Sequence, residues 1–235
     1  MSAIDDTTGW LSADNFEGFI HFLNSAVSAV IPDGKIFFFD SAWYPPRVHP
    51  IDFNIYRFYG MFLNVNESHW VFYLYDKAYE KAKVFDSYRS PVNLKTVKRA
   101  LTNSLARNKT NEKMGLKVSV PTTIIGLGWQ REDDNVNCGI YCARIALWVL
   151  RCLEKGINPM MEDPVLPRWY DINYARRHYF RILNNPNDFD AVQSFEVGSE
   201  RGRRALPIPD EPDSPYTQPL PSNISSIDDF ILGRF

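Results

Sequence analysis

Residues 138–155 read CGIYCARIALWVLRCLEK, and this stretch decides the fold. Its apolar residues occur nearly all round a helix instead of along one stripe, a pattern typical of a helix buried inside a domain. We therefore expect it to be the central helix, with Cys138 at its N-terminus. The elements that cover it must come from the rest of the chain.

Short stretches rich in aromatic and β-branched residues precede this helix and predict a sheet. They are KIFFFD from Lys35, MFLNV from Met61, HWVFYLY from His69, KAKVFD from Lys81 and TTIIGLGW ending at Trp129. The third and fourth stretches are separated by about five polar residues, a spacing that suits a hairpin.

Three further helices are predicted. The first has Ser12 as N-cap and an apolar stripe at Phe16, Phe19, Ile20, Leu23 and Val27. The second opens at Ser90-Pro91, with the proline at its first position and Leu94, Val97, Leu101 and Leu105 on one side. The third lies between Glu162 and Leu183, after Pro167. Together the elements predict an α+β domain with a mixed central sheet.

The composition excludes several classes of protein. The chain has 235 residues, 45% of them apolar, which is enough to fill a core. Its 26 basic and 28 acidic side chains give a formal charge of −2, so no cationic field attracts nucleic acid or a membrane surface. No apolar run could span a bilayer, and no secretory signal is visible.

The end of the chain differs from the rest. Six prolines lie between Pro207 and Pro221, interleaved with Asp, Glu and Ser. Such a stretch buries too little apolar surface to offset its ordering entropy. We predict a domain of residues 1–198 and a disordered, proline-rich tail of residues 199–235.

His69, Asp86 and Cys138 are the candidate catalytic residues. His69 begins one predicted strand, Asp86 ends the next, and Cys138 begins the buried helix, so the three can converge at element ends. A helix N-terminus stabilises a thiolate. Cys138 would be the nucleophile, His69 the base and Asp86 the group that orients the imidazole. Gly139 would leave space for a substrate, and Gln130 could join the Cys138 N–H as an oxyanion donor.

Several sequence blocks resemble the Ulp1/SENP family of cysteine proteases, which cleave ubiquitin-like proteins and include the adenovirus-type maturation proteases. The blocks are WLSADNFEGFIHFL at Trp10, KIFFFDSAWY at Lys35, SHW at His69, VFDSY at Asp86 and QREDDNVNCGIYC before and after Cys138. The separations of 17 (86 − 69) and 52 (138 − 86) residues are close to those of the family's eukaryotic members. The resemblance spans about residues 10–150.

The resemblance implies an adenain-like fold and roles for individual residues. His69, Asp86 and Cys138 match the family's triad, and Gln130 with the Cys138 amide matches its oxyanion hole. Trp10 and Trp70 match the two tryptophans that cover the channel for a Gly-Gly tail.

Two departures from the family pattern stand out. Gln130 stands eight residues before Cys138 (138 − 130), where most eukaryotic members have six. Ala13 stands where the family has an Asp that helps bind the modifier, and the adjacent Asp14 is expected to substitute.

These observations predict a monomeric thiol peptidase that cleaves after the Gly-Gly of SUMO, or of NEDD8 or ubiquitin. Metal and other cofactors are not expected, because no CxxC or HxxxH motif occurs. Cys142 and Cys152 are expected to be core residues, and the absence of a disulfide framework fits the nucleus or cytoplasm, or a host cell if the chain is a bacterial effector. Three alternatives stay open: a viral or transposon polyprotein protease, an acyltransferase effector, and an inactive binding module.

Overall fold

The computed structural model describes residues 9–31, 35–40, 53–107 and 116–200. Contacts divide the chain into two compact units, one of residues Thr8–Pro164 and one that contains the described residues from Val165 onward. The predicted domain of residues 1–198 stays a prediction. The predicted tail lies outside the described residues beyond Glu200, as do residues 41–44 of the KIFFFDSAWY block.

A five-stranded mixed sheet forms the middle of the larger unit, in the spatial order β1-β2-β3-β4-β5. Its strands are β1 (Ile36–Asp40), β2 (Phe58–Val65), β3 (His69–Asp76), β4 (Lys81–Asp86) and β5 (Thr122–Gly126), and a 3₁₀ turn (Phe53–Ile55) precedes β2. The β2–β3 and β3–β4 pairs are antiparallel, which confirms the predicted hairpin, and the two outer pairs are parallel.

Two strand ends differ from the sequence prediction. Strand β2 begins at Phe58, before the predicted Met61. Strand β5 ends at Gly126, not at Trp129, because Gly128 has a φ of 65° and turns the chain away from the ladder. The backbone N–H of Trp129 then donates to the Ser87 carbonyl at 2.8 Å.

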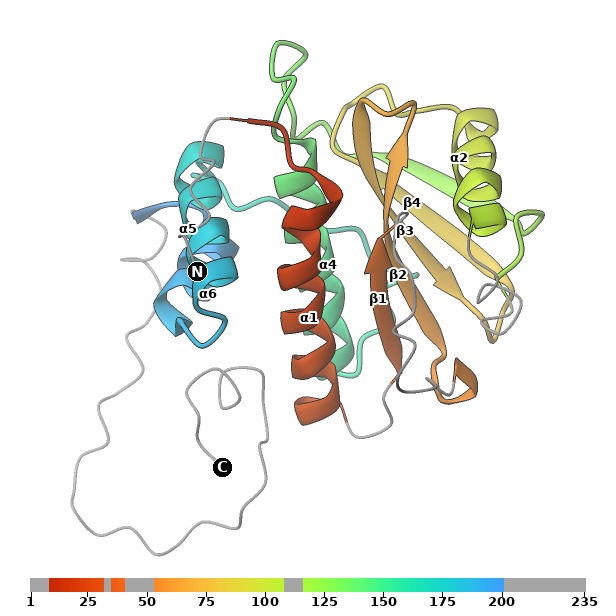
Figure 1. Ribbon diagram of the computed structural model, residues 1–235, viewed down its shortest axis with the longest axis horizontal. Coiled ribbons are helices and arrows are strands. Elements are labelled where there is room, and N and C mark those ends of the chain that lie inside the picture. The colour runs from red at the N-terminus through yellow and green to blue at the C-terminus, as the bar shows by residue number, and fades with distance from the viewer. Residues whose placement is uncertain (1–8, 32–34, 41–52, 108–115, 201–235) are drawn as a thin grey trace, which may run out of the picture. The chain divides into compact units, whose positions relative to one another are not determined.

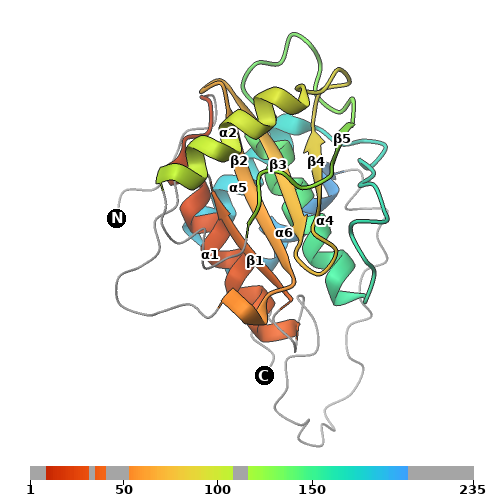
Figure 2. The ribbon, with the colours of Figure 1, turned by 90° about the vertical axis from the view of Figure 1, so that its right-hand side faces the viewer.

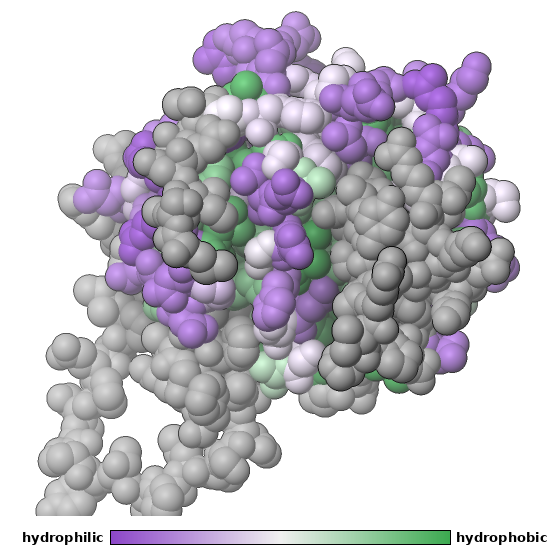
Figure 3. All heavy atoms as spheres, in the orientation of Figure 1, coloured by the Kyte–Doolittle hydropathy of each residue, from purple (hydrophilic) through white to green (hydrophobic). Residues whose placement is uncertain are grey.

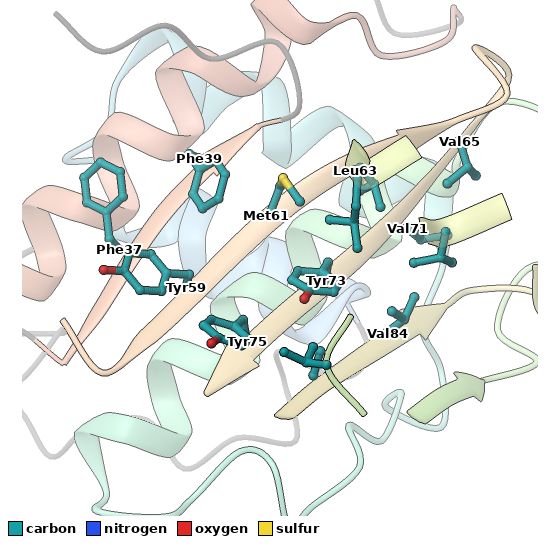
Figure 4. Close-up of a cluster of buried hydrophobic side chains, with 14 residues drawn as sticks. Phe37, Phe39, Tyr59, Met61, Leu63, Val65, Val71, Tyr73, Tyr75 and Val84 are labelled. Atoms are coloured by element: carbon teal, nitrogen blue, oxygen red, sulfur yellow. The ribbon is translucent and has the colours of Figure 1, made fainter. Parts of the chain in front are cut away.

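One face of the sheet carries a continuous apolar core (Figure 4). Alternate residues of β1 to β4 point to this face, as the two-residue period of a strand requires. Helix α2 (Leu94–Arg107) covers them with Val97 and Leu101. The cluster contains Phe37, Phe39, Tyr59, Met61, Leu63, Val65, Val71, Tyr73, Tyr75, Ala82, Val84, Val97, Leu101 and Val120.

Helix α2 begins later than predicted, at Leu94 and not at Pro91. The Asn93 side chain accepts a hydrogen bond from the Thr96 N–H at 2.9 Å, so Asn93 satisfies an amide of the first turn. The Val92 N–H donates instead to Asp86 Oδ2, at 2.9 Å. The segment around Pro91 is therefore held by Asp86 outside the helix.

The other face of the sheet is covered by α1 (Ala13–Val30) and α4 (Cys138–Glu154), which lie side by side in Figures 1 and 2. Phe16 of α1 stacks on Phe62, and Trp148 of α4 meets Phe85 edge-on. Figure 3 shows hydrophilic residues along the outer side of α1, with hydrophobic residues beside them. The predicted stripe of α1 and the buried character of α4 are both confirmed.

The smaller unit contains α5 (Ile172–Asn184) and α6 (Phe189–Val197), whose Tyr179 and Phe195 rings lie 5.8 Å apart. Helix α5 begins later than predicted because the Asp171 side chain accepts the first amides of its helix. Helix α6 was not predicted from the sequence. In the described part of the chain, none of the helices combines the length and apolarity needed to cross a bilayer.

Candidate active site

Three element ends meet at the candidate site. His69 is the first residue of β3, and Asp86 is the last residue of β4. The two strands are antiparallel, with Phe72 opposite Phe85, so the start of β3 and the end of β4 lie at the same end of the sheet. Cys138 is the first residue of α4, which packs on β3 and β4. His69 Nε2 lies 2.8 Å from Asp86 Oδ1, and the Cys138 side chain is close enough to His69 to raise the pKa of the imidazole. The structure therefore brings the three predicted side chains together.

The Asp86 carboxylate is fully buried and accepts three hydrogen bonds. Its Oδ1 lies 2.8 Å from His69 Nε2 and 3.0 Å from the Tyr88 amide, and its Oδ2 accepts from the Val92 amide. Two backbone donors thus fix the carboxylate, which in turn fixes the imidazole ring. With Nε2 bound to Asp86, Nδ1 is the ring nitrogen left for the Cys138 thiol.

The pKa of His69 is raised from 6.5 to about 9. Burial lowers this pKa, but the hydrogen bonds with Asp86 and Cys138 and the negative charges of both residues outweigh burial. The imidazole is therefore protonated at neutral pH. A cation beside a cysteine at a helix N-terminus favours the thiolate, which is the nucleophilic form of the side chain.

The three cysteines have different surroundings. Burial raises the pKa of Cys142 well above the ordinary value and that of Cys152 to about 11, so both are thiols at neutral pH. Only Cys138 contacts an imidazole among these three. Within residues 9–31, 35–40, 53–107 and 116–200, no group of three or more His, Cys, Asp or Glu side chains is arranged to hold a metal ion.

Gly139 has a packing role that differs from the prediction. A Cβ atom there would lie 2.9 Å from Leu11 Cδ1 and 3.1 Å from Phe16 Cζ. Glycine at this position therefore lets the first turn of α4 approach the start of α1, where the sequence suggested space for a substrate.

Gln130 is buried and its side-chain amide is held on both sides. Its Oε1 accepts from the Ser87 hydroxyl at 2.5 Å, and its Nε2 donates to the Asp134 carbonyl at 2.5 Å. Its backbone N–H donates to the Ser87 carbonyl at 2.9 Å. Ser87 follows Asp86 directly, so the structure links Gln130 to the triad through one peptide unit. One Nε2 hydrogen remains for another acceptor.

Trp10 and Trp70 lie against each other, with ring centroids 5.9 Å apart and planes tilted by 35°. Trp70 is nearly fully buried, and its Nε1 donates to the Leu11 carbonyl at 2.8 Å. A peptide between two rings needs about 7 Å, twice the normal carbon contact distance. The two indoles must therefore separate before they can enclose a substrate tail.

A pocket of about 760 Å³ lies beside these two rings. Its wall comprises the start of α1, the β2–β3 turn and one side of α2, and most of its other side chains are polar. The residues are Trp10, Ser12, Ala13, Asn64, Asn66, Glu67, Trp70, Thr96, Arg99, Ala100, Asn103 and Ser104. Asp14, the third predicted substrate contact, is exposed and does not line this pocket.

Sequence reasoning missed Ser87, Tyr88 and Asp134, which contact Gln130 or His69. The Tyr88 ring lies against the His69 ring, with centroids 5.0 Å apart and planes tilted by 30°, and its hydroxyl donates to the Asp134 carbonyl at 3.0 Å. The extra length between Gln130 and Cys138 was the signal that something must hold this loop.

Comparisons with known proteins bear on the fold. No family model and no curated protein matches the sequence. Among solved structures, the SUMO protease Ulp1 with its catalytic cysteine oxidised to a sulfonic acid is similar to this chain, with a TM-score of 0.50, 16% identity and coverage of 74% of this chain and 77% of that chain. The Ulp1 domain in complex with the yeast SUMO ortholog has 16% identity, a TM-score of 0.46 and coverages of 74% and 76%.

The Xanthomonas campestris effector XopD bound to ubiquitin has 13% identity, a TM-score of 0.46 and coverages of 66% and 81%. The chain therefore has the fold of the Ulp1-like cysteine proteases. This confirms the predicted α+β class with a mixed central sheet and a buried helix behind it.

Proposed function

We propose that this chain is a thiol-dependent peptidase that cleaves after the C-terminal glycines of a ubiquitin-like modifier, with SUMO as the first candidate. The observation that carries the proposal is the contact of His69 with both Asp86 and Cys138 at the N-terminus of α4. A base, an acid that orients it and a cysteine at a helix start are the parts of a thiol protease site.

The proposed reaction has two steps, the acylation of Cys138 and the hydrolysis of the resulting thioester. The Cys138 thiolate attacks the carbonyl carbon of the last glycine, and the oxygen takes the electron pair. Gln130 Nε2 and the Cys138 N–H, which has no intrahelical partner in the first turn, stabilise this oxyanion. Protonated His69 donates its proton to the leaving amine as the carbon–nitrogen bond breaks. His69 then takes a proton from water, which hydrolyses the thioester.

The surroundings of the site support a glycine-ended substrate. Trp10 and Trp70 are flat and adjacent, and Trp70 follows His69 in the chain, so a tail enclosed between the two rings must lack side chains. The polar pocket beside the rings can accept the residues upstream of the glycines. SUMO is the first candidate because the solved structure with a TM-score of 0.50 is that of a SUMO protease.

The test uses SUMO, NEDD8 and ubiquitin, each with a C-terminal propargylamide that reacts with an active-site thiol. We expect a covalent adduct with at least one of them, detected by intact mass, and no adduct for Cys138→Ala. Cys142→Ala is the matched control and should react like the wild type, because Cys142 is buried away from solvent.

Absence of an adduct with all three modifiers would overturn the proposed substrate class. Alkylation of Cys138 by iodoacetamide in the same sample then distinguishes the alternatives. An unreactive Cys138 favours an inactive binding module. A reactive one leaves the polyprotein protease, tested by cleavage of a viral precursor after small residues, and the acyltransferase, tested by labelling with acetyl-CoA.

A further inference from the structure

The loop between Gln130 and Cys138 is folded around one side chain. Asp134 Oδ1 accepts hydrogen bonds from the Val136 N–H at 3.2 Å, the Asn137 N–H at 3.2 Å and the Asn137 side-chain amide at 3.0 Å. Asn137 is the residue before Cys138, so these bonds set the path by which the chain enters α4. The loop is thereby held in a defined conformation in spite of its length.

The backbone carbonyl of Asp134 receives two further donors. The Gln130 side-chain amide donates to it at 2.5 Å and the Tyr88 hydroxyl at 3.0 Å. A carbonyl oxygen only accepts, and two donors occupy its two lone pairs. The Ser87 hydroxyl on the other side of Gln130 can donate or accept, so it leaves both orientations of the amide open. The Asp134 carbonyl is therefore the group that requires the amide nitrogen of Gln130 to face the loop.

Tyr88 connects this carbonyl to the other groups of the site. Its ring lies 5.0 Å from that of His69 at an angle of 30°, and its backbone N–H donates to Asp86. The position of the Tyr88 hydroxyl is thus set by the same residues that form the candidate triad. A shift of the triad and a shift of the loop are coupled through this one side chain.

We propose that Tyr88 and Asp134 are positioning residues of the oxyanion hole, which act by fixing the orientation of the Gln130 amide and the path of residues 131–137. The inference rests on the proposed function, in which Gln130 donates to the oxyanion. It explains how the chain accommodates a loop that is two residues longer than in most eukaryotic members of the family it resembles. The hydrogen bond from the Tyr88 hydroxyl to the Asp134 carbonyl holds this longer loop in place.

The first test is Tyr88→Phe, which removes the hydroxyl and keeps the ring against His69. Tyr79→Phe is the matched control, since Tyr79 is exposed. The probe is the modifier that forms the adduct, carrying a C-terminal aminomethylcoumarin. Loss of a whole oxyanion donor lowers kcat by about 10²- to 10³-fold, and we expect a loosened donor in Tyr88→Phe to lower kcat about tenfold.

The expected signature separates positioning from general damage. KM and the rate of Cys138 alkylation by iodoacetamide should stay within about twofold of the wild type, because the thiolate and His69 are untouched. Unchanged kcat in Tyr88→Phe would overturn the inference. So would a parallel loss of kcat and alkylation, which indicates a disturbed triad.

The second test compares Asp134→Ala with Asp134→Asn. The asparagine keeps an Oδ1 that accepts from Val136 and Asn137, so kcat should stay within about threefold of the wild type, whereas the alanine should lower it at least about tenfold. Equal kcat values for the two variants would contradict a role for the Asp134 side chain.

If the wild type hydrolyses none of the modifier probes, the proposed function fails and the positioning inference is judged by NMR. The side-chain NH₂ resonances of Gln130 should then shift and lose protection from exchange in Tyr88→Phe but not in Tyr79→Phe. Unchanged Gln130 resonances in Tyr88→Phe would be sufficient to overturn the positioning inference.

Discussion

His69 is the residue whose state decides the chemistry of the site. Its side chain is mostly buried, and burial alone would favour the neutral ring. Asp86 on one side and Cys138 on the other reverse that preference. The imidazole is therefore protonated at neutral pH, so the proton needed by the leaving amine is already in place.

The contribution of Cys138 to the pKa of His69 can be measured by NMR titration of the four histidines. In the wild type His69 should titrate with a pKa of about 9. In Cys138→Ala the cysteine side chain that helps to raise this pKa is lost, so the pKa of His69 should fall by at least about one pH unit. Cys142→Ala should leave it unchanged, and a wild-type pKa near 6.5 would contradict the protonated imidazole.

At the scale of elements, β4 holds more than the candidate acid. Lys83 is nearly fully buried, and its Nζ donates to the carbonyls of Met160 at 3.4 Å and Glu162 at 2.7 Å. It also pairs with Asp163 at 2.6 Å. These contacts attach the segment after α4 to the strand that ends in Asp86, so they hold the chain beyond the C-terminal end of α4 near the sheet.

Lys83→Ala should lower the free energy of unfolding by about 2 kcal/mol, because it leaves two carbonyls of this segment without their donor. Lys81→Ala on the same strand is the control, since its side chain is exposed and its loss should change stability by less than about 0.5 kcal/mol. Urea unfolding of the two variants measures the difference. Equal midpoints for both would show that Lys83 does not hold the segment.

Element interiors could be predicted from the sequence, whereas several element ends could not. The stripe of α1, the all-round apolar character of α4 and the alternation in β3 are local signals, and each is confirmed. The predicted start of α2 was wrong because the Asp86 carboxylate, at the end of β4, accepts from the Val92 amide and holds this segment outside the helix. Helix α6 was missed although Asp188 caps it and Gly198 ends it.

The candidate site likewise has a part that could be predicted from the sequence and a part that could not. The proximity of His69, Asp86 and Cys138 was predictable because each residue stands at an element end that the sequence marks. The contacts that orient Gln130 were not, because Ser87 bonds it across 43 positions and Tyr88 reaches Asp134 across 46. Such long-range bonds leave no local pattern. Whether Trp10, Trp70 and Asp14 bind substrate stays a prediction.

At the scale of the larger unit, the topology explains why the site lies where it does. The chain leaves β4 at Asp86, covers one face of the sheet with α2 and returns in β5. It then passes to the other face, where α4 packs. Residues 127–137 make this passage, so Gln130 lies on the connection that passes the edge strand and Cys138 follows directly at its end. One connection between the two faces of the sheet therefore positions both the candidate oxyanion donor, Gln130, and the candidate nucleophile, Cys138.

The buried pair of His69 and Asp86 also makes the stability of the whole molecule depend on pH. The pKa of His69 is 6.5 in an unfolded chain and about 9 in the fold, so the stabilisation is fully present below pH 6.5 and is lost as pH rises through about 9. At 1.36 kcal/mol per pH unit, His69 contributes at most about 3 kcal/mol. In Asp86→Asn the carboxylate that raises the pKa of His69 is gone, so the free energy of unfolding should fall less between pH 6 and pH 9.5. Urea unfolding at pH 6 and pH 9.5 measures this decrease in the wild type and in Asp86→Asn. Equal decreases in the two proteins would mean that Asp86 does not hold the proton on His69.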